Sequence, residues 1–230
     1  ISQRSHMQHA RRNISLLIIA QLIFVSGSVI TVTFGGVVGA KLAPSANLAT
    51  LPVSLMVLGT AIGTIPASWL MNLFGRKIGF IGAALTASFS LWLAADSITQ
   101  TRFWQYCIAT GLIGVCLAFS AQLRFAAAES VDVSRAGLAI SLILAGSIGG
   151  AMVGPELIAQ GNTVSADGFI GTLLLAAVLF LIGAVVLLFL KLPKSYDQEA
   201  VNSAIPSRSM FGLLQSPPFL LAVISGTVGY

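Results

Sequence analysis

The sequence predicts an all-α integral membrane protein, and three observations support this fold class. Only 8% of the 230 residues are charged, against about 25% in a typical soluble domain. Hydrophobic residues make up 56% of the chain, and its mean hydropathy is +0.94. These residues fall into long runs, each near the roughly 20 residues that a helix needs to cross a bilayer. We therefore expect a bundle of transmembrane helices in contact with lipid.

Six runs are long enough to span a membrane, and a seventh begins near the end of the chain. The predicted spans cover residues 14–38, 48–74, 78–95, 103–128, 136–159 and 169–190. The first, second, third and sixth contain no charged residue, and the fourth contains only Arg124 near its end. The fifth contains only Glu156, which we expect near its outer end.

The spans divide the chain into four parts. An N-terminal tail at 1–13 precedes a six-helix domain at 14–190, and a polar loop at 191–216 follows. Pro217-Pro218 then opens the predicted start of a seventh helix at 217–230. Within the tail, Ser5-His6-Met7 is typical of the remnant of a cloning tag, so residues 1–6 are candidates for foreign sequence.

The lysines and arginines predict the orientation, because positively charged loops stay on the cytoplasmic side. Nine of them lie on one side of the spans: Arg4, Arg11, Arg12, Arg76, Lys77, Arg135, Lys191, Lys194 and Arg208. The other side has only Lys41 and Arg102. We expect a cytoplasmic N-terminus and a cytoplasmic loop at 191–216, in a cell membrane that we take to be the bacterial cytoplasmic membrane.

A weak internal repeat relates the second and fifth spans. Both place small residues four positions apart beside a proline: Gly59, Gly63 and Pro66 in the second, and Gly146, Gly150, Gly154 and Pro155 in the fifth. These two spans are equivalent if spans one to three and four to six are inverted repeats, as in many transporters. The alternative is that glycine and proline are simply common in membrane helices.

The segment between the second and third spans carries the sharpest motif. Gly75 permits a tight reversal of the chain, and Arg76 and Lys77 follow it directly. A positively charged cytoplasmic hairpin would by itself explain the two cations. Glu129, however, ends the fourth span on the same side. An ion pair between Arg76 and Glu129 is therefore expected to hold one arrangement of the helices and to break in another.

Gly146, Gly150 and Gly154 form a stripe of the kind that brings helix backbones close together. We expect this stripe to be a packing face for a second half of the protein. Pro155 follows the stripe and removes a backbone hydrogen bond, so a bend is expected there.

Together these motifs resemble the major facilitator superfamily, whose members have two six-helix halves joined by a long cytoplasmic loop. Gly75, Arg76 and Lys77 match the end of the family signature Gly-x-x-x-Asp-Arg/Lys-x-Gly-Arg/Lys-Arg/Lys. Ser68 stands for the first glycine of that signature, Asn72 for the acid and Leu73 for the first cation. Asn72 brings no charge, so the charged relay of the family is incomplete here.

Two further segments carry the resemblance. The stretch from Arg124 through Glu129 to Arg135 is similar to the family, and the segment from Gly150 to Pro155 resembles the motif of drug/proton antiporters, with Ile158 in place of the final glycine. The Arg-x-x-Gln-Gly pattern of the fourth helix reads Cys107-Ile-Ala-Thr110-Gly111, without the arginine.

The resemblance implies the fold and the gate. The chain would be the N-terminal six-helix half of a twelve-helix bundle built from inverted three-helix repeats, and its partners would be a C-terminal half, the lipid bilayer and a small-molecule substrate. The implied gating residues are Asn72, Gly75, Arg76, Lys77, Glu129 and Arg135.

The resemblance also implies where a solute would bind, because the family's central cavity is lined mainly by the first and fourth helices. The polar candidates there are Gln21, Thr31, Thr110, Ser120 and Gln122. Gln21 is the largest polar group well inside its run, whereas serines and threonines often bond only to their own helix. Glu156 is the candidate for proton coupling, or alternatively a solvated acid at a helix end.

The sequence thus predicts a secondary active transporter that moves a small organic solute by alternating access, with protons as a candidate coupling ion. Few fixed charges favour a neutral, amphipathic or aromatic solute. An enzyme is disfavoured because the only histidines, His6 and His9, lie outside the spans. We expect no cofactor, metal or nucleic acid. The alternative is a channel or sensor without a transport cycle.

Overall fold

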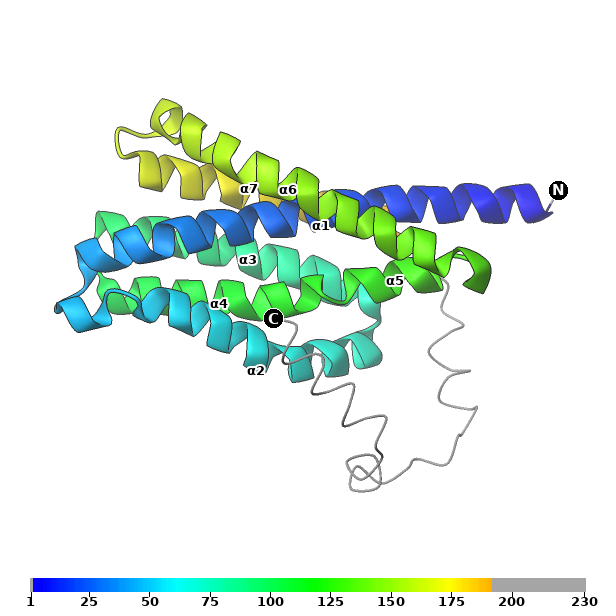
Figure 1. The fold of residues 1–230 in the computed structure, drawn as a ribbon, viewed down its shortest axis with the longest axis horizontal. Helices are drawn as coiled ribbons and strands as arrows, with labels where there is room; N and C mark the ends of the chain where they lie inside the picture. Colours follow the sequence, from blue (N-terminus) through cyan, green and yellow to red (C-terminus); the bar gives the residue numbers. More distant parts are fainter. Residues whose placement is uncertain (1, 192–230) are drawn as a thin grey trace, which may run out of the picture. The chain divides into compact units, whose positions relative to one another are not determined.

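The computed structural model describes residues 2–191, and within that range the chain is helical and contains no strand (Figure 1). Six helical segments are long and apolar enough to cross a membrane, so the prediction of an all-α bundle with six spans is confirmed. The predicted loop beyond Lys191 and the predicted helix start at 217–230 lie outside the described residues.

The helices are α1 (Ser2–Leu42), α2 (Leu51–Phe74), α3 (Arg76–Thr99), α4 (Phe103–Ser120), α5 (Leu123–Glu129), α6 (Ala136–Val164) and α7 (Gly168–Leu188). Short 3₁₀ turns, η1 (Ala46–Leu48) and η2 (Val133–Arg135), precede α2 and α6. Helices α1, α3 and α6 extend beyond the predicted runs, whereas α2 begins three residues later than predicted and α7 ends two residues earlier. Helix α1 extends furthest, and no proline occurs before Pro44 to end it at the edge of its apolar run.

The fourth span is not the single helix that the sequence predicts at 103–128. It is divided into α4 and α5 at Ala121 and Gln122. The Ser120 hydroxyl donates to the Leu117 carbonyl at 2.8 Å, and the Ala121 N–H shares that carbonyl at 3.3 Å. The Gln122 N–H then bonds three residues back, to Phe119. A side chain that competes for a backbone carbonyl in this way interrupts a helix without proline.

Packing between the helices follows an inverted repeat. The connections are short, so successive spans run in opposite directions, and α1 and α4 begin at opposite ends of the bundle (Figure 1). The most extensive contacts join α2 to α4, α1 to α6, and α3 to α7. In an inverted repeat, α1, α2 and α3 of the first group correspond to α4, α6 and α7 of the second group. The contact of α2 with α4 is then the counterpart of the contact of α6 with α1. Each three-helix group thus packs its middle helix against the first helix of the other.

The glycine stripes explain the two closest of these contacts. A Cβ built at Gly150 would lie 2.5 Å from the Leu22 carbonyl oxygen of α1, and one at Gly146 would lie 3.0 Å from the Ile18 carbonyl oxygen. In the other group, a Cβ at Gly63 of α2 would lie 2.9 Å from the Val115 Cα of α4. Glycine is required because the neighbouring helix leaves no room for a side chain.

The expectation that Gly146, Gly150 and Gly154 face a second half of the protein was therefore wrong. All three are buried against α1 inside the described bundle. Pro155 is exposed on α6, and the helix continues past it to Val164. The stripe builds the six-helix domain itself.

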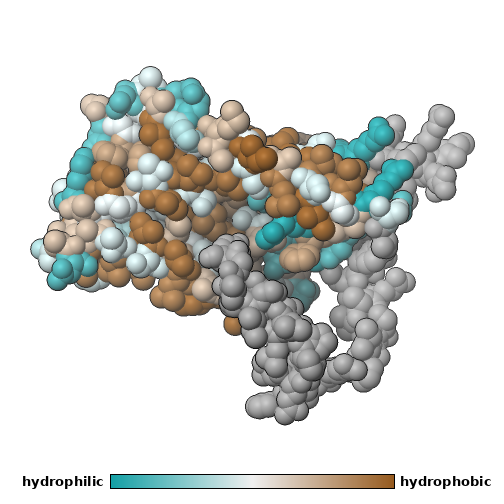
Figure 2. Space-filling model, viewed as in Figure 1, coloured by the Kyte–Doolittle hydropathy of each residue, from teal (hydrophilic) through white to brown (hydrophobic). Residues whose placement is uncertain are grey.

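Exposed side chains in the middle of the bundle are apolar, as a lipid environment requires. Figure 2 shows hydrophobic residues over the middle of the visible face and hydrophilic residues gathered toward its two ends. Among the exposed apolar side chains are Ile65 of α2 and Met152 of α6, which are 77% and 73% exposed. The spans α2 and α6 are the least buried of the six within the bundle. They are consequently the helices whose surfaces are open to lipid or to further protein.

Candidate functional site

At one end of the bundle, the turn between α2 and α3 lies against the C-terminal ends of α5 and α7. We call it the cationic end, after Arg76, Lys77 and Arg135. The turn is made by Gly75 alone, with φ 84° and ψ 152°. No atom lies within 4 Å of a Cβ built there, so glycine is needed for its backbone conformation and not for space. This φ allows α3 to begin at Arg76 directly after α2 ends.

Arg76 and Glu129 form an ion pair across this end, as the sequence predicts. The Arg76 Nη2 atom lies 2.5 Å from Glu129 Oε1, and the side chains are 19% and 37% exposed. The pair joins the first residue of α3 to the last residue of α5. Partly exposed pairs of this kind contribute at most ~1 kcal/mol to stability, so this pair is not what holds the bundle together.

The other predicted gating residues surround this pair without joining it. Lys77 donates from Nζ to the carbonyl of Leu188 at 2.6 Å, which places a positive charge at the C-terminal end of α7, where the helix dipole favours it. Asn72 and Arg135 are exposed, and among the described residues neither side chain makes a hydrogen bond or ion pair. Within residues 2–191 the Asn72 amide therefore makes no hydrogen bond to Arg76, and its role in gating stays a prediction.

A further contact at this end was not expected from the sequence. Asn13, only 3% exposed, donates from Nδ2 to the Lys191 carbonyl at 2.7 Å and accepts from the Lys191 N–H through Oδ1 at 3.2 Å. The amide thus pairs with the backbone at the point where the chain leaves the six-helix domain. The only signal in the sequence is a polar residue directly before the first apolar run.

Of the five predicted solute-binding residues, only Gln21 reaches another helix. It is 9% exposed, and its Nε2 donates to Ser147 Oγ of α6 at 2.9 Å. The hydroxyls of Thr31, Thr110 and Ser120 bond to backbone carbonyls of their own helices, at Gly27, Cys107 and Leu117. Gln122 is half-buried, and its side chain makes no hydrogen bond within residues 2–191. These three hydroxyls thus bond locally, as hydroxyls in helices often do, and their role in solute binding stays a prediction.

The candidate for proton coupling lies on the surface of the bundle. Glu156 is exposed on α6, and its Oε1 accepts a hydrogen bond from Gln160 Nε2 at 2.7 Å. It follows Pro155, which is also exposed. Within residues 2–191 no group of three or more His, Cys, Asp and Glu side chains is arranged to hold a metal ion.

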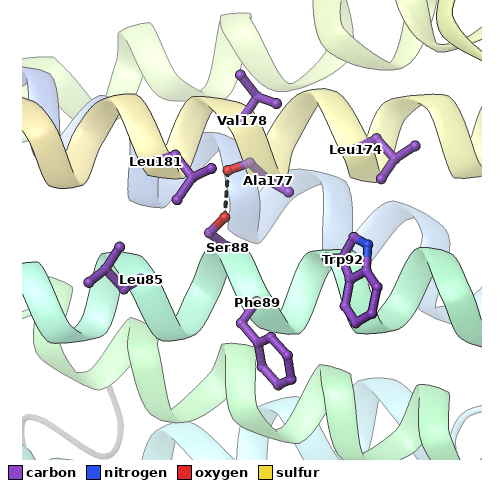
Figure 3. Close-up of a pocket in the computed structure, with 8 residues that line it drawn as sticks. All are labelled: Leu85, Ser88, Phe89, Trp92, Leu174, Ala177, Val178 and Leu181. Atoms are coloured by element: carbon purple, nitrogen blue, oxygen red, sulfur yellow. Dashed lines mark hydrogen bonds between the residues drawn. The ribbon is translucent and has the colours of Figure 1, made fainter.

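A groove of about 360 Å³ lies between α3 and α7 (Figure 3). It is lined by Leu85, Ser88, Phe89, Trp92, Leu174, Ala177, Val178 and Leu181. The Ser88 hydroxyl is already used, because it donates to the Ala177 carbonyl at 2.8 Å (Figure 3). The rings of Phe89 and Trp92 are about half exposed on the outer surface. Apart from the Trp92 indole N–H, which makes no hydrogen bond within residues 2–191, the lining offers no free polar side-chain group, and it is otherwise that of a surface in contact with acyl chains.

Comparison with known proteins places these features in a family. The sequence profile of the Major Facilitator Superfamily matches residues 16–230. The riboflavin transporter RfnT of Brucella anthropi is 36% identical over 223 residues, which cover 96% of this chain and 56% of that protein. Two uncharacterized MFS-type transporters of Bacillus subtilis are each 22% identical. The match to YddS covers 89% of this chain and 47% of that protein, and the match to YdeG covers 80% and 44%. No solved structure matches at comparable significance.

The chain spans about half the length of the curated relatives it matches. The match covers the six spans, the turn at Gly75 and the segment that carries Glu129. With six membrane-crossing helices packed as an inverted repeat, this multi-pass membrane protein belongs to the Major Facilitator Superfamily.

Proposed function

We propose that this chain is the N-terminal six-helix half of a secondary transporter that moves riboflavin, or a solute closely similar to it, across the membrane by alternating access. The likeness to RfnT carries the substrate assignment, because 36% identity extends over 96% of the chain. A second half, with which the described helices would enclose the solute, is part of the proposal.

The interior of the bundle suits a neutral solute. Between Asn13 and Lys41, α1 carries no charged residue, and α6 carries none before Glu156. Charges inside a span are costly and usually mark ionic substrates or proton paths. Riboflavin presents a large neutral ring system and hydroxyl groups, so apolar walls with a few amides and hydroxyls match its chemistry.

The gate of the proposed cycle is the Arg76–Glu129 pair. It joins α3 to α5, and α5 is separated from α4 by the interruption at Ala121 and Gln122. We propose that the pair holds one arrangement of the cationic end and breaks when the two halves rock about the solute. This end is taken to face the cytoplasm, because positively charged loops are retained there.

Proton coupling is a further part of the proposal. A proton-driven cycle needs a group in the path that binds and releases a proton, and Glu156 of α6 is the candidate in the described part of the chain. Its position on the exposed surface of α6 would place it against the second half of the transporter. Uptake measured with and without an imposed pH gradient, in wild type and in Glu156→Gln, tests this role.

The substrate assignment is tested by uptake of labelled riboflavin into cells that cannot synthesise it. Cells that express the full-length protein should take up riboflavin in a saturable manner, well above cells with an empty vector. Unlabelled riboflavin should compete, whereas a charged analogue such as flavin mononucleotide should compete poorly. Uptake no greater than that of the empty vector, from protein shown to reach the membrane, would refute the assignment.

A further inference from the structure

A buried amide in α1 has one hydrogen-bonding atom that no residue of the described chain satisfies. Gln21 is nine-tenths buried, and its Nε2 donates to Ser147 of α6 at 2.9 Å. Its Oε1 is buried and has no hydrogen-bond partner within residues 2–191. A buried carbonyl oxygen without a donor opposes folding, so such atoms are rare in native structures and each calls for an explanation.

The position of this amide agrees with a binding role. Gln21 lies eight residues beyond Asn13, which is about 12 Å along the helix from the cationic end. The glycine stripe on α6 brings the two helices close enough for Ser147 to hold the amide, since Gly146 and Gly150 contact α1 at Ile18 and Leu22, on either side of Gln21. Val25 and Ser28, one and two turns further along α1, are only half-buried, so this side of the helix is partly open.

The pair also presents a defined hydrogen-bonding pattern. The Ser147 hydroxyl accepts the bond from Gln21, and it donates to no other described residue. Gln21 Oε1 is thus a free acceptor, beside a hydroxyl whose proton is still available. An acceptor next to a donor is the complement of an –NH–C(=O)– edge, which lactams and imides carry and which sugars and carboxylic acids lack.

We propose that Gln21 Oε1 accepts a hydrogen bond from a ring N–H of the transported solute, and that this contact selects neutral planar heterocycles with a lactam or imide edge. Ser147 positions the amide and donates to the adjacent carbonyl of the same edge. This inference rests on the proposed function, because the imide of the flavin ring is the edge in question. Because Oε1 is buried in the described structure, the solute would reach it in an arrangement of the helices in which this site is opened.

The test compares two ligands on the full-length protein in detergent, by quenching of flavin fluorescence. The ligands are riboflavin and 3-methylriboflavin, in which a methyl group replaces the imide proton. Wild type should bind riboflavin about 3- to 10-fold more tightly than the methylated ligand, which corresponds to one neutral hydrogen bond. Gln21→Leu should lose that preference and bind the two ligands almost equally.

If the amide had only a structural role, Gln21→Leu would melt at a lower temperature than wild type. Under the proposal, Gln21→Leu removes an unpaired buried oxygen, so its melting temperature should equal or exceed that of wild type. The matched control is Gln105→Leu, since the Nε2 of Gln105 is satisfied by Asp96 at 2.8 Å. That variant should melt at a lower temperature and keep the ligand preference.

Two outcomes overturn the inference. If Gln21→Leu keeps the wild-type preference for riboflavin over 3-methylriboflavin, the amide does not read the imide proton, and the proposed function is unaffected. If wild type binds neither flavin, the proposed function fails and this inference fails with it.

Discussion

Replacing Gly150 by alanine should destabilise the seam between α1 and α6. The added Cβ would lie 2.5 Å from the Leu22 carbonyl oxygen and 2.8 Å from the Val25 Cβ, whereas ordinary contacts begin at 3.4 Å. The shortfall of about 0.9 Å against a backbone atom cannot be relieved by a rotamer change, so α1 must move as a whole. Overpacking of this kind costs ~1–3 kcal/mol.

Part of that cost is offset by the helix propensity of alanine, which exceeds that of glycine by ~0.5–1 kcal/mol. The net loss is therefore about 0.5–2 kcal/mol. At roughly 2–4 °C per kcal/mol, the melting temperature should fall by about 1–8 °C. The assay is thermal unfolding of the purified full-length protein in detergent, followed by size-exclusion chromatography.

The matched control is Gly137→Ala in the first turn of the same helix, where no atom lies within 4 Å of the added Cβ. This variant should melt at the wild-type temperature or slightly above it. If Gly150→Ala is as stable as Gly137→Ala, α1 and α6 do not meet along the glycine stripe, and the packing described above is wrong.

Three further predictions concern the cationic end. Asn13→Ala removes both hydrogen bonds to Lys191 and leaves its backbone groups unpaired, which should cost ~1–3 kcal/mol; an unchanged melting temperature would contradict the contact. Gly75→Ala and Gly75→Asn should each cost ~1–3 kcal/mol, because φ 84° and ψ 152° lie in a region that essentially only glycine adopts and in which asparagine has no advantage over alanine; stability equal to wild type in both variants would show that the turn does not need glycine. Arg76→Ala and Glu129→Gln should each lower riboflavin uptake without loss of expression, and the double variant should be no worse than the more impaired single variant. Additive losses in uptake would mean that the two residues do not act as a pair.

The sequence predicts the bundle well because lipid imposes a simple rule on it. Every span must be long, apolar and helical, so hydropathy alone identifies six spans. The turn at Gly75 and the Arg76–Glu129 contact could also be predicted from the sequence, because a glycine between two spans and charges on the same side of the membrane are local signals. The interruption at Ala121 could not be predicted, since a serine that competes for a carbonyl looks like any other serine in a helix.

Contacts between distant segments show where reasoning from the sequence ends. The spacing of Gly146, Gly150 and Gly154 indicates that some helix comes close, but it does not say which helix, and the expected partner was wrong. Asn13 and Lys191 are 178 residues apart, and no local pattern pairs them. Gln21 was singled out by its size and depth, but its unpaired oxygen became visible only when its neighbours were in place.

Counterflow of riboflavin in proteoliposomes tests the central claim most directly. Vesicles containing the full-length protein and loaded with unlabelled riboflavin are diluted into a trace of labelled riboflavin. A carrier that works by alternating access exchanges one for the other, so the label should accumulate transiently inside, above its external concentration. Label that only equilibrates, or that stays at the level of protein-free vesicles, would contradict a riboflavin carrier built on this six-helix domain.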